Sequence, residues 1–156
     1  MKVVLRNLRE SDANISYKWR NDPEIWVFTG SRPDKTITPE IEREWIRGVL
    51  QKKDQKRFAI CINEDRKYIG NVQLTDINDH SAEFHIFIGE KKFWGMGIAS
   101  ETTRKIVKYG FETLGLNEIF LFVHKRNVAA IRSYKKCGFI ESEFDENKIK
   151  MTIVNG

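Results

Sequence analysis

The spacing of hydrophobic and polar residues changes repeatedly along the chain, and each spacing predicts one kind of element. Short apolar or alternating runs predict strands over residues 3–5, 58–62, 68–74, 82–89, 119–123 and 148–154. Apolar residues at helical intervals predict helices over about 12–21, from 38 onward, over 98–114 and over 127–136. The order is mixed α and β, and the strand–helix–strand–helix run over 84–136 requires parallel neighbours in one sheet.

One predicted strand, over residues 82–89, alternates cleanly and therefore presents two different faces. Its apolar face is formed by Phe84, Ile86 and Ile88. Its opposite face is formed by Glu83, His85 and Phe87. The strand thus carries titratable side chains on one side only.

Composition limits the class of protein. The length of 156 residues fits one domain, expected over 1–156, and 40% hydrophobic residues are enough to build a core. No apolar run approaches the roughly 18 residues of a membrane helix, and the charged N-terminus does not resemble a secretory signal. Cys61 and Cys137 have no metal-ligand spacing, so we expect no metal and a reduced, cytoplasmic compartment.

The chain is modestly basic. Its 27 Lys and Arg against 22 Asp and Glu give a net charge of +5, which suggests an anionic partner. Basic pairs such as Lys91-Lys92 and Lys125-Arg126 are scattered among acids instead of forming one stripe. A small nucleic-acid-binding domain is therefore an alternative, but a disfavoured one.

A glycine turn precedes the predicted helix over 98–114. Small residues at Gly95, Gly97 and Ala99 allow backbone N–H groups to approach an anion, and the helix N-terminus adds its positive end. A pyrophosphate suits such a turn. Glycines that serve turn geometry alone are the alternative interpretation.

The helix over 127–136 places an amide and a phenol on one face. Asn127, Ala130 and Tyr134 are separated by helical intervals, and the small residue between the polar ones leaves room for a long, thin ligand. The alternative is that Asn127 only caps the helix and Tyr134 is a core aromatic residue.

These two segments together resemble the GNAT superfamily of acetyl-CoA-dependent N-acetyltransferases. The resemblance is carried by W-G-M-G-I-A over 94–99 and N-x-A-A-x-x-x-Y-x-x-x-G-F over 127–139. The segments Leu5-Arg6-Asn7-Leu8 and Trp19-Arg20-Asn21-Asp22-Pro23 are similar to the branch that acetylates ribosomal-protein N-termini, polyamines and amino sugars. The resemblance implies a mixed, mostly antiparallel sheet of about six to seven strands, with a splayed parallel pair and about four helices. It also leaves open a homodimer.

The resemblance further implies roles for particular residues. The residues that would cradle the CoA pyrophosphate are Trp94, Gly95, Met96, Gly97, Ile98 and Ala99. The backbone of Phe87, Ile88 and Gly89 would pair with the pantetheine arm, which Asn127 and Ala130 would also contact. Tyr134 would protonate the departing thiolate. Trp94 departs from the family, which often has Gln or Arg there.

The general base and the acceptor are less determined. Glu83 and His85 share a strand face, and either could be the base, directly or through water. The alternative is a solvated strand residue for Glu83 and an ordinary half-buried residue for His85. We select Glu83, because Ala82-Glu83-Phe84 is similar to spermidine acetyltransferases. The expected acceptor is a primary amine of a small molecule, either a polyamine or an amino sugar, with a protein N-terminal amine as the alternative.

Acceptor specificity is expected from the irregular segment 22–38 and the turn over 75–81. The aromatic and basic residues that would suit a nucleotide-linked amino sugar are Trp26, Phe28, Arg32 and Lys35. The carboxylates that would suit a polyamine are Asp22, Glu24, Asp34, Asp76 and Asp79. The sequence does not choose between them.

Overall fold

The computed structural model describes residues 1–27 and 33–156 and contains one seven-stranded sheet. The strands are β1 (Val3–Asn7), β2 (Lys56–Ile62), β3 (Lys67–Thr75), β4 (Ser81–Ile88), β5 (Glu118–His124), β6 (Ile140–Phe144) and β7 (Lys148–Val154). Their order is β1-β2-β3-β4-β5-β7-β6, and the β4–β5 pair is parallel whereas the other neighbours are antiparallel. The predicted mixed sheet with a parallel pair is therefore confirmed.

Helices connect and cover these strands. The α-helices are α1 (Ala13–Arg20), α2 (Pro23–Trp26), α3 (Pro39–Leu50), α4 (Ile98–Glu112) and α5 (Val128–Lys136), with 3-10 turns η1 (Glu10–Asp12) and η2 (Lys91–Phe93). The sequence did not predict α2 or β6. The first is one turn long, with Asp22 as its N-cap and Pro23 at its first position, and the second is an edge strand with exposed residues.

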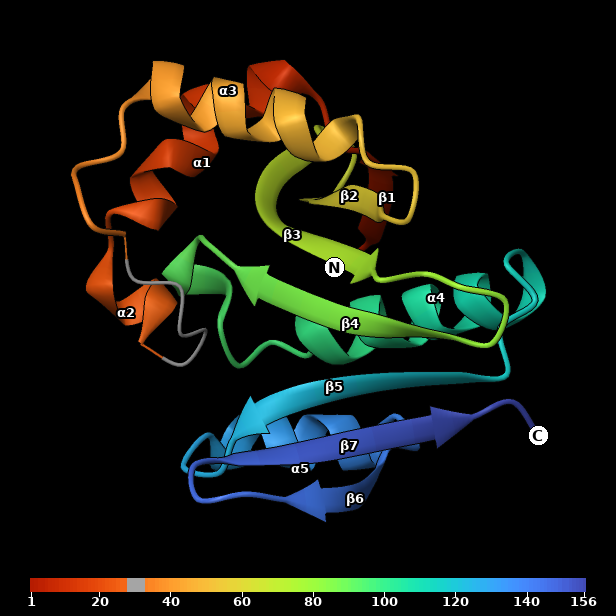
Figure 1. The fold of residues 1–156 in the computed structure, drawn as a ribbon. Coiled ribbons are helices and arrows are strands. Elements are labelled where there is room, and N and C mark those ends of the chain that lie inside the picture. Colours follow the sequence, from red (N-terminus) through yellow and green to blue (C-terminus); the bar gives the residue numbers. More distant parts are fainter. Residues whose placement is uncertain (28–32) are drawn as a thin grey trace.

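The sheet has helices on both faces, but they cover different strands (Figure 1). Helices α4 and α5 pack on one face, where Ile106, Val107 and Tyr134 meet the apolar side of β4 and β5. Helices α1 and α3 pack on the other face, where Trp19 and Ile46 meet β2 and β3. Among the described elements, Figure 1 shows no helix in front of β5 and β7, so that part of the second face is open.

Strands β4 and β5 pair only at one end. The paired residues run from Ser81 to Glu83 on β4, and no described residue of β5 pairs with the rest of that strand. At Phe84, where the pairing stops, the aromatic ring contacts the ring of Tyr134 from α5, with centroids 6.1 Å apart. The later part of β4 therefore has an edge that lacks a neighbouring strand.

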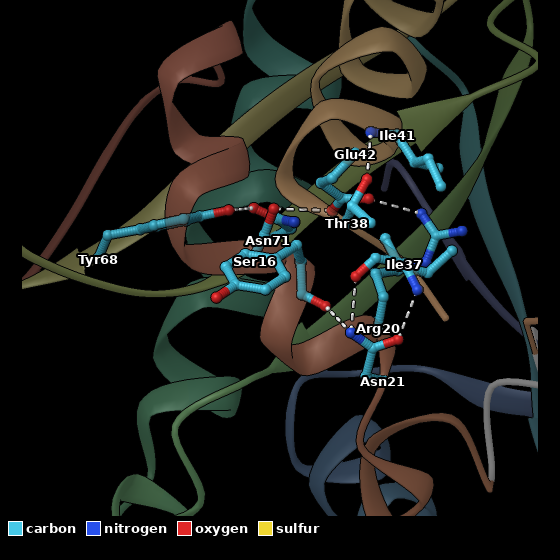
Figure 2. A network of polar contacts seen from close by, with 10 residues as sticks. Ser16, Arg20, Asn21, Ile37, Thr38, Ile41, Glu42, Tyr68 and Asn71 are labelled. Carbon is cyan, nitrogen blue, oxygen red and sulfur yellow. Dashed lines mark hydrogen bonds and ion pairs between the residues drawn. The ribbon is translucent and has the colours of Figure 1, made fainter. Parts of the chain in front are cut away.

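A buried polar network holds α1 against α3. The carboxylate of Glu42, only 2% exposed, accepts hydrogen bonds from the Ser16 hydroxyl at 2.7 Å and from Arg20 Nη1 at 3.0 Å (Figure 2). One residue further, the Asn21 amide accepts from the Ile37 N–H and donates to the Ile37 carbonyl, both at 2.8 Å. These bonds fix α1 and the segment before α3 as one unit.

No helix in the described part of the chain is long and apolar enough to cross a membrane.

Candidate functional site

The unpaired edge of β4 is the centre of the candidate site. The Gly89 N–H donates to the Ile69 carbonyl of β3 at 2.7 Å, so the backbone of Gly89 faces β3. Because backbone groups alternate along a strand, those of Ile88 face the other way, toward the unpaired edge. Of the predicted pantetheine-binding residues, Ile88 is thus the one whose N–H is directed to the open edge. The Gly89 amide is engaged with β3.

Gly89 has a second role, which is to make space for Trp19 of α1. A Cβ atom at this position would lie 2.0 Å from Cδ2 of the Trp19 ring. The buried indole packs beside Tyr68 and Phe87, with centroids at 4.8 and 5.8 Å, and donates to Glu90 Oε2 at 2.8 Å. The ring therefore fixes the end of β4 from the α1 side.

The glycine turn lies at the start of α4 and is open to solvent. Gly95 and Gly97 have positive φ angles of 75° and 79°, and a Cβ at either position would meet nothing within 4 Å. Gly97 is the N-cap of this 15-residue helix, and Ile98, 3% exposed, anchors the first turn in the core. The conformation favours glycine, and the open space at the start of the helix would allow an anion to approach the backbone N–H groups.

Trp94 connects this turn to the edge of β4. Its indole Nε1 donates to the Ile88 carbonyl at 2.9 Å, and the side chain is 44% exposed. The carbonyl of Ile88 therefore has a partner, which leaves its N–H as the group presented at the edge. A structural role of Trp94 is consistent with its departure from the residue types common in the family.

Tyr134 lies on the α5 side of β4. Its ring packs against Phe84 and Phe139, and its hydroxyl has no hydrogen-bond partner among the described residues. Burial raises the pKa of this phenol well above its ordinary value of 10, so it carries its proton at neutral pH. A protonated, unpartnered phenol is suited to donate a hydrogen bond or a proton.

At the start of α5, Asn127 can serve both as a helix cap and as a ligand-binding amide. Its Oδ1 accepts from the Ala130 N–H at 3.3 Å, which makes it the helix cap. The cap uses the oxygen and leaves the Nδ2 donor for a ligand. Close by, the Ser133 and Ser100 hydroxyls lie 2.6 Å apart and join α5 to the first turn of α4.

Glu83 and His85 lie on the opposite face of β4, and the structure brings them together. His85 Nε2 is 3.2 Å from Glu83 Oε2 and also 3.2 Å from the Thr75 hydroxyl. Burial lowers the pKa of His85 below its ordinary value of 6.5; Glu83 and Asp76 oppose this effect and Arg57 adds to it. The imidazole is therefore neutral at neutral pH. Tyr134, the candidate acid, therefore lies on one face of β4, and the candidate bases Glu83 and His85 lie on the other.

The segment predicted to select the acceptor is only partly described. Phe28 and Arg32 lie outside the described residues. Asp34 and Lys35 help to line a pocket of about 480 Å³ between α1 and α3, together with Arg20, Pro33, Ile37, Ile41, Glu42 and Trp45. None of these residues comes from β4, so we do not assign the acetyl-transfer site to this pocket.

Two of the acids predicted for a polyamine have partners of their own. Lys91 Nζ lies 2.9 Å from Asp22 Oδ2 and 3.0 Å from Glu24 Oε1, which ties α2 to the segment after β4. Hydrogen bonding to Lys91 lowers the pKa of Asp22. Lys91, one of the basic residues that flank the glycine turn, is thus engaged by α2.

Neither cysteine is set up as a nucleophile. Both Cys61 and Cys137 are free thiols, and burial raises the pKa of each. Among the described residues, no group of three His, Cys, Asp or Glu side chains is arranged to hold a metal ion.

Sequence reasoning missed the residues that surround Glu83 on the open face. Phe120 of β5 is the direct cross-strand neighbour of Glu83, and Lys150 of β7 lies over its ring, with Nζ 4.8 Å from the centroid. Phe122, 48% exposed, contacts the edge of the same ring. The signal was the alternation of exposed aromatic residues in β5, which looked like a fully apolar strand.

The chain is similar to several known proteins. The model of the acetyltransferase (GNAT) domain matches residues 2–140. Acetyltransferase PseH of Campylobacter jejuni is 29% identical over 150 residues, covering 94% of this chain and 88% of that protein. Spermidine N(1)-acetyltransferase of Escherichia coli is 30% identical over 138 residues, covering 86% of this chain and 66% of that protein. The spermidine N-acetyltransferase of Vibrio cholerae in complex with CoA and spermine has a TM-score of 0.87 and 26% identity, covering 97% of this chain and 95% of that one.

Proposed function

The chain belongs to the acetyltransferase (GNAT) family, and we propose that it transfers the acetyl group of acetyl-CoA directly to a primary amine of a small molecule. The observation that carries the proposal is the unpaired edge of β4. The Ile88 N–H is directed to this edge, Trp94 joins the glycine turn to Ile88, and the phenol ring of Tyr134 packs on Phe84 of the same strand. This combination offers donors for a pyrophosphate, an edge for an extended amide arm and a proton for a leaving thiolate.

The donor half of the site uses mainly backbone groups. The turn from Trp94 to Ala99 surrounds the pyrophosphate, with Gly97 allowing close approach of the phosphate to the start of α4. The pantetheine arm lies along β4 as an added strand, and the Asn127 Nδ2 supplies a side-chain donor. The Ile88 N–H polarises the thioester carbonyl.

The proton balance defines what the side chains must do. The amine enters as an ammonium ion and leaves as an amide, so its nitrogen loses two protons. Glu83 takes the first proton, and the neutral nitrogen then attacks the carbonyl carbon, forming a C–N bond. As the C–S bond breaks, Tyr134 protonates the thiolate, and the second proton from the nitrogen restores the phenol. Each turnover therefore releases one net proton.

The open face beside Glu83 favours one acceptor class. Lys150 repels additional positive charges in a substrate that lies across Phe120, whereas a ring-bearing acceptor with an anionic group suits a cation and an exposed aromatic residue. The similarity to spermidine acetyltransferases supports the polyamine alternative. We propose an amino sugar that carries a phosphate or nucleotide group, and spermidine is the competing candidate.

An amine panel tests the proposal. CoA release is measured with spermidine, amino sugars, nucleotide-linked amino sugars and an N-terminal peptide as acceptors. We expect a higher kcat/KM for the anionic amino sugars than for spermidine, and Lys150→Glu should reverse this preference by about tenfold. Equal preference in Lys150→Glu and the wild type contradicts the acceptor assignment. No CoA release with any amine contradicts the function itself.

Tyr134→Phe tests the donor half. Loss of the hydroxyl is expected to lower kcat by about a hundredfold, with little change in the KM for acetyl-CoA, because the proton is needed only as the thiolate leaves. Tyr109→Phe is the matched control, since this tyrosine of the same core packs against Phe58 away from the open edge. Unchanged turnover in Tyr134→Phe removes Tyr134 from the mechanism.

A further inference from the structure

Two polar side chains on neighbouring strands contact the same ring nitrogen of a histidine. Glu83 and His85 lie on one face of β4, and Thr75 of β3 is the cross-strand partner of Glu83. His85 Nε2 lies 3.2 Å from both the Glu83 carboxylate and the Thr75 hydroxyl. The other described charged groups that act on His85 are Arg57 of β2 and Asp76 after β3.

The donor and acceptor capacities of these three groups allow a proton to move between them. A carboxylate only accepts, a hydroxyl donates or accepts, and a neutral imidazole nitrogen carries either a hydrogen or a lone pair. When Nε2 has a lone pair, the Thr75 hydroxyl donates to it. When Nε2 carries a hydrogen, it donates to Glu83. The ring nitrogen therefore has a partner before and after it takes up a proton.

The exposure of the two titratable residues gives the transfer a direction. The Glu83 side chain is 20% exposed, whereas the His85 side chain is 42% exposed. A proton on the carboxyl group of Glu83 thus reaches water more readily through the imidazole than from the carboxyl group itself. Burial also lowers the pKa of His85, so an imidazolium there gives its proton to water readily.

We propose that His85 relays the proton released in each turnover from Glu83 to water, with the Thr75 hydroxyl holding the imidazole in place between transfers. The inference rests on the proposed function, because it presumes that Glu83 accepts the amine proton. The Glu83 O–H bond breaks as the proton moves to Nε2, which restores the carboxylate and forms an imidazolium. The imidazolium then loses the Nε2 proton to water, so Nε2 regains the lone pair that accepts the next proton, and Nδ1 keeps its hydrogen throughout. His85 acts through Glu83 and is thus a positioning and relay residue.

The test compares the same substitution at two histidine–glutamate pairs. His80 Nε2 lies 3.2 Å from Glu118 Oε1 just before the start of β4, so His80→Gln is the matched control for His85→Gln. For His85→Gln we expect kcat to fall at least about tenfold near neutral pH and the loss to shrink toward about pH 10, where a substrate amine deprotonates in water. His80→Gln should leave the profile unchanged.

Chemical rescue separates a relay from a packing role. Free imidazole is expected to restore a substantial part of the activity of His85→Ala, because it supplies the missing proton acceptor. A loss that is equal at every pH, or that imidazole does not reduce, overturns the relay. Thermal unfolding of His85→Gln and His85→Ala shows whether they remain folded. If a variant is only partly folded, imidazole can still restore the activity of its folded molecules.

Failure of the relay can be distinguished from failure of the proposed function. If the wild type releases CoA with an amine and Glu83→Gln does not, the function stands whatever His85→Gln shows. If the wild type releases no CoA with any amine of the panel, the function fails and the relay fails with it.

Discussion

The two faces of β4 contribute to the site through different parts of the polypeptide. On the α4 and α5 side, the groups proposed to bind the ligand are mostly backbone: the Ile88 N–H, the turn at Gly95 and Gly97, and the start of α4. On the other side, side chains dominate: the Glu83–His85 pair lies on β4, and the network around Glu42, outside the candidate site, holds together the two helices that cover this face. The first region depends on chain conformation, and the second depends on the identity of individual side chains.

Because of this difference, the two regions are sensitive to different kinds of substitution. A backbone N–H is present in every residue except proline, so the donor half is sensitive to φ angles and to added volume. The opposite half contains a carboxylate that is almost completely buried, and loss of a partner there leaves a charge without compensation. Substitutions on the two sides should therefore fail in different ways.

The largest effect is expected from Glu42→Ala, which tests the side-chain half. It leaves the Ser16 hydroxyl and Arg20 without their buried acceptor, and we expect a loss of about 3–5 kcal/mol in the free energy of unfolding. Urea denaturation measures the loss. Glu44→Ala on the same helix is the control, since this carboxylate is exposed and its pairing with the exposed Arg47 contributes little to stability. Similar losses in both variants would contradict the role of the network.

A smaller loss of stability is expected from Gly89→Ala, which tests the boundary between the two halves. The added methyl group collides with the Trp19 ring and should cost about 1–3 kcal/mol, because the indole is packed on several sides. Gly48→Ala in α3 is the control. A Cβ there meets nothing within 4 Å, and the better helix propensity should raise stability by up to about 1 kcal/mol. An unchanged melting temperature in Gly89→Ala would mean that Trp19 moves freely.

The smallest effect is expected from Gly97→Val, which tests the backbone half. The side chain fills the space at the start of α4, and we expect acetyl-CoA to bind about tenfold more weakly. Gly115→Val carries the same conformational strain, since its φ is 68° and a Cβ there also meets open space, but it lies after the other end of α4. Calorimetric titration with acetyl-CoA should distinguish the two variants. Equal affinities would exclude the turn as the phosphate site.

Most of the sheet was predictable from the sequence because its strands have strong local patterns. The alternation over 82–89 identified β4 and the correct residues on each face, and the strand–helix–strand order predicted its parallel pairing with β5. The edge strand β6 was missed because Ile140 and Phe144 are exposed and their pattern is dominated by acids between them. Helix α2 was missed because a single turn after Pro23 has no periodicity to detect.

The site was predictable where it depends on local sequence and unpredictable where it depends on packing. The spacing of the glycines at 95 and 97 before a predicted helix indicates a turn, and both residues have a positive φ in the structure. By contrast, the contact between Gly89 and Trp19 joins residues 70 positions apart, and no local pattern encodes it. The run from Trp19 to Pro23 was predicted to end a helix and to resemble one branch of a family, but its contacts were not predicted: its residues pack on Gly89, bind Glu42, bridge to Ile37 and begin α2.

The backbone edge of β4 also bears on how this enzyme can acquire new substrates. Because the Ile88 N–H does not depend on the side chain at that position, mutations can accumulate around it without removing the donor that we propose for the thioester. The acceptor face is different, since Phe120, Phe122 and Lys150 are side chains on strands that no described helix covers. Under the proposed assignment, substitutions at these three positions would change the acceptor while the acetyl donor stays the same.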